Sequence, residues 1–137
     1  KDAPPKPDDL HLDPGALEAI FEGLKNATEE GGTANRIHYP MPDGTTVVED
    51  MIAVPGVSAI AKTGTATASP IVVKNEAGEP EVVRTGDHAW MLALVGKEGK
   101  APRYAIAVIL EYAGSGGRAA GPIMNQVVWA LKDEGYL

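Results

Sequence analysis

The feature that most constrains the fold of this chain is a pair of continuous apolar runs, residues 89–95 and 104–110, joined by a short turn. The turn, residues 96–102, contains glycine, charged residues and proline. Short apolar runs that lack polar alternation are typical of central strands buried on both faces of a sheet. The sequence therefore predicts two adjacent central strands, around which the rest of the chain must pack.

A helical pattern precedes these runs. Asp13 can cap a helix whose first turn accepts Pro14, because a proline at that position sacrifices no intrahelical hydrogen bond. Four apolar residues then follow at helical spacing: Leu17, Ile20, Phe21 and Leu24. We expect this amphipathic helix to end at Gly31-Gly32, since glycine tolerates the left-handed backbone that ends helices.

A second helical pattern closes the chain. A glycine-rich stretch, residues 114–117, reads as a turn and leads to Pro122, a residue suited to the start of a helix. The apolar residues after it are spaced so that they share one face. They are Ile123, Val127, Ala130 and Leu131. We expect this face to be buried against the sheet.

Between the two helical patterns lie weaker strand signals. Residues 57–68 are rich in small and β-branched residues and stop before Pro70, which predicts a strand. Residues 71–73 and 82–83 are short apolar runs that flank turn residues, so a solvent-facing hairpin is expected. Residues 36–55 contain several prolines and read as an irregular surface excursion.

The order of helix, three main strands and helix predicts an α+β fold with an antiparallel sheet and helices packed on its faces. The chain has 137 residues, of which 44% are hydrophobic, enough for one core. Residues 1–12, which include Pro4, Pro5 and Pro7, are expected to form a linker or lead-in. We expect residues 13–137 to form a single unit.

Composition excludes several classes of function. A net charge of −7 disfavours a nucleic-acid partner, and the absence of cysteine excludes disulfides and thiol chemistry. The three histidines, His11, His38 and His88, lack metal-ligand spacing, so we expect no metal and no cofactor. No apolar run approaches the roughly 20 residues that a membrane-spanning helix needs.

The most informative string is Lys62-Thr63-Gly64-Thr65, which falls on the strand expected at residues 57–68. An ammonium group and hydroxyls can hold a carboxylate, and a glycine lets a substrate approach the backbone. The backbone N–H after the glycine can face an oxyanion. Taken alone, the string favours an edge strand that carries a solvated lysine.

Four further blocks accompany this string in order. Downstream are residues 87–91 (DHAWM), residues 104–111 (YAIAVILE) and residues 116–122 (GGRAAGP). Upstream, the first helix is followed by Gly32-Thr33-Ala34. In order and spacing the set resembles the C-terminal portion of the transpeptidase domain of class B penicillin-binding proteins, nearest to the penicillin-binding protein 2-like group.

The resemblance implies a fold of the penicillin-binding and serine β-lactamase type. It also implies a peptidoglycan D,D-transpeptidase that cross-links stem peptides through a serine acyl-enzyme and binds penicillin. Lys62 and Thr65 would be catalytic, while Thr63, Gly64 and Thr65 would contact the substrate. Peptidoglycan stem peptides and β-lactams would be the partners. The resemblance places the protein on the extracytoplasmic, periplasmic side of the bacterial inner membrane, anchored by a segment outside this chain.

Two motifs of that family are missing. The serines Ser58, Ser69 and Ser115 are the only ones in the chain, and none begins an S-x-x-K or S-x-N pattern. In the family both motifs lie N-terminal to the Lys-Thr-Gly strand. We therefore expect that the chain begins after them and is inactive alone.

Other readings remain open. The same strand occurs in serine β-lactamases and penicillin-sensing domains, although the DHAWM and GGRAAGP blocks favour the transpeptidase. A non-catalytic module that binds other cell-wall synthesis proteins is an alternative, as is self-association of a fragment. His88 either borders the site or has a structural role, which we favour. Trp90 and Trp129 are expected in the core or in sheet-helix packing rather than on a sugar-binding surface.

Overall fold

The computed structural model describes residues 8–137. The elements of this part are α1 (Pro14–Thr28), β1 (Arg36–Pro40), β2 (Thr46–Asp50), β3 (Val57–Thr67), β4 (Ile71–Lys74), β5 (Pro80–Arg84), β6 (Asp87–Lys97), β7 (Tyr104–Leu110), the π-helical turn η1 (Gly116–Ala120) and α2 (Gly121–Asp133). The strands form a three-stranded sheet, ordered β3-β6-β7, and two ribbons, β1-β2 and β4-β5. Every pairing is antiparallel, so the predicted α+β class is confirmed.

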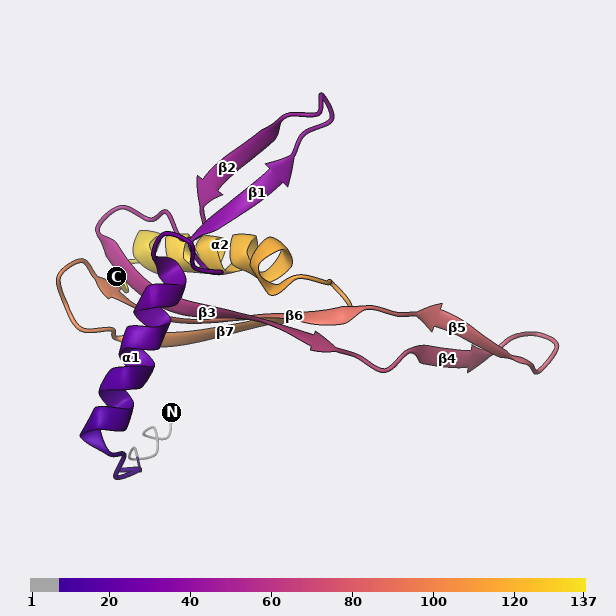
Figure 1. Ribbon diagram of the computed structural model, residues 1–137, viewed down its shortest axis with the longest axis horizontal. Helices are drawn as coiled ribbons and strands as arrows, with labels where there is room; N and C mark the ends of the chain where they lie inside the picture. Colours follow the sequence, from indigo (N-terminus) through magenta and orange to yellow (C-terminus); the bar gives the residue numbers. More distant parts are fainter. Residues whose placement is uncertain (1–7) are drawn as a thin grey trace.

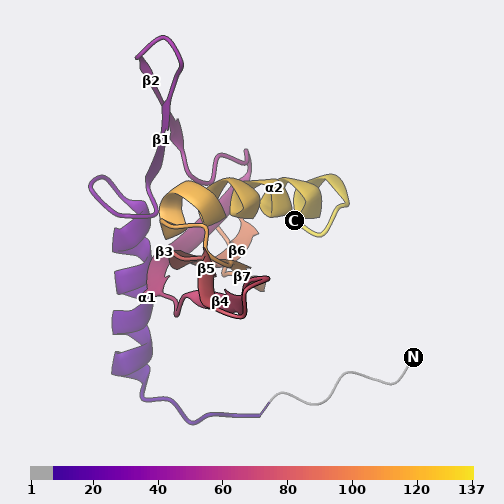
Figure 2. The ribbon, with the colours of Figure 1, turned by 90° about the vertical axis from the view of Figure 1, so that its right-hand side faces the viewer.

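Helix α1 begins as the sequence indicates. The side chain of Asp13 accepts a hydrogen bond from the backbone N–H of Ala16 at 2.9 Å, and Pro14 occupies the first turn. The helix ends at Thr28, a few residues before the expected Gly31-Gly32, and contacts β3 beside the sheet (Figure 2). None of its residues is buried. The expected lead-in, residues 1–12, lies partly outside the described residues, and residues 8–12 form no helix or strand.

Strands β6 and β7 confirm the positions of the two apolar runs, but the expectation that they are buried on both faces is wrong for this chain. Along β6, Met91 and Ala93 are buried, whereas Trp90 is 43% exposed and Leu92 is 42% exposed. Exposure alternates because successive side chains point to opposite faces and helix α2 covers only one face. The other face of the central sheet is therefore apolar and open around Trp90 and Leu92, while α1 lies beside it at Ile60 of β3.

Helix α2 covers the buried face of the sheet (Figure 2). The residues it buries are Gly121, Met124 and Val128, not the expected face, and Ile123 stays exposed. Gly121 packs closely on Met51, since an added Cβ would lie 3.1 Å from Cγ of that residue. Residues three and seven positions later then share its face. Of the expected residues, Val127 and Leu131 are half-buried beside this face, whereas Ile123 and Ala130 are exposed, so the sequence pattern was only partly right.

Two ribbons project from this core (Figure 1). The expected hairpin is present as β4-β5, and all of its strand residues are exposed. The expected irregular excursion is instead the hairpin β1-β2, closed by a turn at Gly44, whose φ is 85°. Asp43 fixes this turn, since its carboxylate accepts hydrogen bonds from the N–H and hydroxyl of Thr45 at 2.9 and 2.6 Å.

Candidate active-site wall

The Lys62-Thr63-Gly64-Thr65 segment occupies the second half of β3, which is an edge strand of the central sheet. On one side it pairs with β6, where Lys62 faces Leu92 and Gly64 faces Trp90. On its other side, β3 pairs with no strand of residues 8–137. An unpaired strand edge offers backbone N–H and C=O groups to an extended peptide.

The strand's pleat divides the four residues between two faces. Lys62 and Gly64 share the open apolar face with their cross-strand partners, and the Lys62 ammonium donates a hydrogen bond to its neighbour's carbonyl, Thr63 O, at 2.8 Å. Thr63 and Thr65 lie on the face that α2 covers. The structure therefore does not gather the side chains of Lys62, Thr63 and Thr65 on one surface. They meet only at the edge of β3.

The two threonine hydroxyls are held by elements that are distant in sequence. Thr63 Oγ1 donates a hydrogen bond to Thr33 Oγ1 at 2.9 Å, and Thr65 Oγ1 accepts one from the Gly116 N–H at 3.2 Å. Gly116 packs directly on the sheet, because an added Cβ would overlap the carbonyl oxygens of Gly64 and Trp90. Only glycine permits this close approach, which brings η1 against the strand.

A cavity of about 360 Å³ opens beside these hydroxyls. We call it the arginine pocket. It is lined by Thr33, Arg36, Ile37, His38, Met51, Thr63, Thr65, Ser115, Gly117 and Arg118. Four of these side chains are hydroxyls, two are guanidinium groups, and none is a carboxylate. A pocket of this chemistry suits a carboxylate or another oxyanion.

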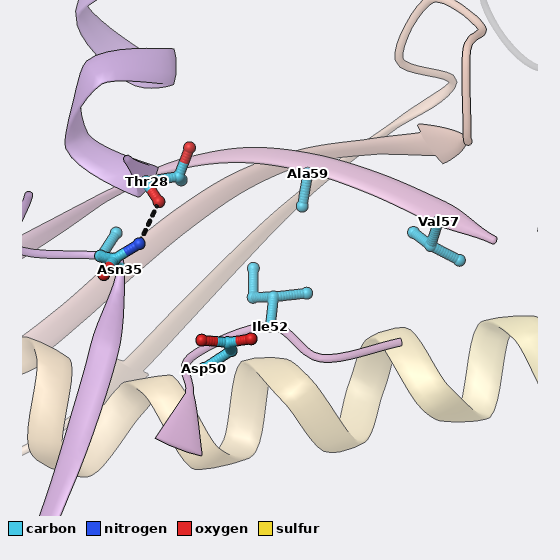
Figure 3. A pocket seen from close by; sticks show the side chains of 7 residues that line it. Thr28, Asn35, Asp50, Ile52, Val57 and Ala59 are labelled. Atoms are coloured by element: carbon cyan, nitrogen blue, oxygen red, sulfur yellow. Dashed lines mark hydrogen bonds between the residues drawn. The ribbon is translucent and has the colours of Figure 1, made fainter. Parts of the chain in front are cut away.

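A second cavity, of about 310 Å³, lies where α1, the β1-β2 ribbon and the first half of β3 meet (Figure 3). Asn35 donates its side-chain amide to the carbonyl of Thr28 at 2.7 Å, while Ile52 and Ala59 add apolar surface. It shares no lining residue with the arginine pocket. Its hydrogen bond joins the end of α1 to the strand that follows, so we read it as a structural junction.

His88 is engaged in backbone support. Its Nδ1 accepts a hydrogen bond from the Tyr112 N–H at 3.1 Å, and the two rings meet edge to face at 4.9 Å. Tyr112 has a φ of 54°, a left-handed conformation that is uncommon outside glycine. These contacts agree with the structural role favoured for His88. The two tryptophans depart from their expected core positions, since Trp90 and Trp129 are both exposed.

Other types of site receive no support from the described chain. Residues 8–137 contain no group of three or more His, Asp or Glu side chains that could hold a metal ion. Within the same range, no helix has the length and apolar character needed to cross a membrane.

Comparison with protein families decides the identity of the domain. The family model described as penicillin binding protein transpeptidase domain matches residues 1–128. The chain belongs to this family. Membership puts the domain among acyl-transferring enzymes whose ligands are β-lactams and peptidoglycan. Searches of curated proteins and of solved structures found no match.

For a penicillin-binding transpeptidase domain, the sequence predicts the Lys-Thr-Gly strand but not all of its surroundings. Arg36, His38 and Arg118 line the cavity beside Thr63, yet none was singled out. The sequence does contain an indication that Arg118 lies near the site, because this residue belongs to the GGRAAGP block. Arg36 carries no such indication, since it belongs to a hairpin whose sequence predicts irregular chain.

Proposed function

We propose that this chain forms the Lys-Thr-Gly wall of a class B, penicillin-binding protein 2-like D,D-transpeptidase. The reaction runs in two steps. A serine oxygen attacks the carbonyl carbon of the penultimate D-Ala of a stem peptide, the bond to the last D-Ala nitrogen breaks, and a proton passes to that leaving amine. An amine of a neighbouring stem peptide then attacks the ester, forms the new amide and releases the serine.

The observation that carries this proposal is the edge position of the Lys62–Thr65 segment in β3. An extended stem peptide can lie along this edge, where Thr63 and Thr65 offer hydroxyls to its terminal carboxylate. Lys62 supplies positive charge from the opposite face, and Gly64 leaves the backbone accessible. The amide of Thr65 would act as one oxyanion donor.

The nucleophile comes from a segment outside these 137 residues. None of Ser58, Ser69 and Ser115 is followed by a lysine three residues later. The open face that carries Lys62 also exposes Trp90 and Leu92, which suits it to packing against the part of the domain that holds the serine. An activated serine requires an adjacent base, and within residues 8–137 no hydrogen bond joins the hydroxyl of any of the three serines to a basic side chain.

Intact-mass spectrometry with a labelled penicillin tests the proposal. The isolated chain is expected to gain no adduct. A longer protein that includes the preceding region should gain one penicillin per molecule, on a serine of an S-x-x-K motif outside this chain. A stoichiometric adduct on Ser58, Ser69 or Ser115 would contradict the proposed division of the site.

We also propose that the protein acts on the periplasmic side of the bacterial inner membrane, where its substrate lies, anchored by a segment outside this chain. The DHAWM and GGRAAGP blocks favour a transpeptidase over a β-lactamase or a penicillin sensor. Protease accessibility in spheroplasts, compared with that in intact cells, tests the location. A periplasmic domain should be cleaved by added protease in spheroplasts but not in intact cells. Protection from the protease in spheroplasts would place the domain in the cytoplasm and refute the proposed location.

A second candidate function is that of a non-catalytic module that binds other cell-wall proteins. The observation in its favour is the β4-β5 ribbon, which exposes Val72, Val73, Val82 and Val83. The sequence upstream of this chain discriminates the two: an S-x-x-K followed by an S-x-N supports the enzyme, and their loss supports the binding module.

A further inference from the structure

The arginine pocket is a cationic site in an acidic chain. Asp and Glu outnumber Lys and Arg by 19 to 12, yet no carboxylate lines this cavity. In the part of the chain that the structure describes, Arg118 forms no ion pair. Arg36 has one partner, Asp50, with 3.7 Å between Nε and Oδ1. Because both side chains of this pair are largely exposed, the pair is weak and leaves Arg36 able to bind another anion.

The two arginines reach the pocket from different elements with anchored backbones. Arg36 begins β1 and precedes the buried Ile37, whereas Arg118 lies within η1. The η1 backbone is fixed at Gly117, where an added Cβ would lie 3.2 Å from the Met51 side chain and 3.3 Å from Thr33 O. The backbones that carry both guanidinium groups are therefore held beside Thr63. Such preorganisation lowers the cost of binding an anion.

We propose that the arginine pocket is a second carboxylate subsite, which selects stem peptides that carry a free side-chain carboxylate in addition to their C-terminal one. This inference rests on the proposed transpeptidase function and specifies its substrate class. An extended peptide advances about 3.3 Å per residue, so a residue two or three positions before the terminus lies roughly 7–10 Å along the β3 edge. Arg36 and Arg118 would hold its carboxylate, while Thr63 and Thr65 hold the terminus.

Phosphate groups also bind pairs of guanidinium groups. The anion in this pocket could therefore be a carboxylate of the peptide or a separate phosphate, and the two have to be distinguished. The cavity shares Thr63 and Thr65 with the strand edge on which the peptide would lie. This continuity favours a carboxylate carried by the peptide itself over a separate phosphate. Inorganic pyrophosphate serves as the probe for the other source.

The experiment compares two peptides that both end in D-Ala-D-Ala and differ at one earlier side chain, a carboxylate in one and its carboxamide in the other. The full-length protein binds each, and the readout is the ratio of the two dissociation constants. We expect about a tenfold preference for the carboxylate at low salt, with a smaller one at high salt. Amide chemical shifts of Thr63 and Gly117 should respond to the carboxylate peptide.

Substitutions locate the preference. Arg118→Gln and Arg36→Gln should each bring the ratio close to one, while Arg118→Lys, which keeps a charge without the planar fork, should retain part of it. Asp50→Asn should raise the ratio, since it removes the competing partner of Arg36. Lys100→Gln removes one positive charge at the β6-β7 turn and should leave the ratio unchanged. Melting curves confirm that each variant folds.

Two results would overturn the subsite: equal affinity of the wild-type protein for the two peptides, or a preference that survives loss of both arginines. Arginine-dependent binding of pyrophosphate without a peptide preference would overturn the carboxylate assignment. All of these are binding measurements, so they do not depend on catalytic activity. Absence of a penicillin adduct on the full-length protein would instead sink the proposed function, so the two failures are distinguishable.

Discussion

The backbone N–H of Gly116 donates a hydrogen bond to Oγ1 of Thr65 across 3.2 Å, and thereby joins the bend after β7 to the Lys-Thr-Gly strand. The contact matters because Gly116 is buried and its N–H points at a hydroxyl that we place in the substrate site. The same oxygen therefore serves the fold and would serve the ligand.

Thr65→Val removes this acceptor while it keeps the shape of the side chain. An unsatisfied buried N–H costs about 1–3 kcal/mol, so the free energy of unfolding should fall by roughly 1 kcal/mol or more. Penicillin acylation of the full-length protein should slow as well. Thr65→Ser keeps the oxygen and should restore both, as measured by urea denaturation and stopped-flow acylation. Equal stability of the Val and Ser variants would show that the contact contributes nothing.

Lys62→Ala separates chemistry from stability. Lys62 is exposed, so the loss of its hydrogen bond to Thr63 O should change the melting temperature little. A charge-assisted contact of roughly 1.5–3 kcal/mol that tightens in the transition state would slow acylation about ten- to a hundredfold. Lys97→Ala, at the exposed end of β6, is the matched control. Acylation by Lys62→Ala at the wild-type rate would make Lys62 an ordinary strand lysine.

Local patterns predicted the strands and the cap of α1, because those features depend on neighbouring residues such as Asp13 and Pro14. They failed where contacts between distant parts of the chain determine which residues are buried. The buried face of α2 includes Gly121, which packs on Met51, 70 residues earlier in the chain. Local composition also predicts the strand that carries Lys62-Thr63-Gly64-Thr65, and the resemblance adds its role, but Arg36 reaches the cavity through a hairpin that the sequence of residues 36–55 does not predict.

Substitution of His88 tests whether this residue has a structural role and no catalytic one. His88→Ala leaves the Tyr112 N–H without its acceptor in a strained left-handed conformation, so unfolding should cost about 1–3 kcal/mol less. Acylation rates of the folded variant should stay near the wild-type value. A large drop in acylation with unchanged stability would instead place His88 in the site.

Asp43 makes the β1-β2 turn sensitive to acid. The Thr45 hydroxyl, followed by the Thr45 backbone N–H, lowers the pKa of the Asp43 carboxyl in the folded hairpin. A lowered folded-state pKa means that the turn gains stability above the unfolded pKa of about 3.9 and loses it as pH falls through the folded value. Amide shifts of Gly44 and Thr45 should therefore move below pH 4. In Asp43→Asn this acid transition should vanish, and its persistence would point to another carboxyl.

The last prediction concerns the open face of the central sheet. Trp90, Leu92 and Ile109 are 43%, 42% and 45% exposed, and the register places them side by side with Lys62 at the edge. At roughly 25 cal/mol per Å², even 400 Å² of uncovered apolar surface corresponds to about 10 kcal/mol, comparable to the stability of a typical domain. We therefore expect the isolated chain to self-associate or to be only marginally stable in dilute solution.

Sedimentation velocity over a hundredfold dilution, with circular dichroism melts at the same concentrations, measures this. The wild-type chain should either shift toward smaller species or melt at lower temperature as it is diluted, because association stabilises the folded state by mass action. Leu92→Glu places a charge in the middle of the open face and should abolish association, whereas Val72→Glu on the β4-β5 ribbon should not. A compact monomer with a high melting temperature that is independent of concentration would show that these residues form a self-sufficient domain and that the face needs no partner.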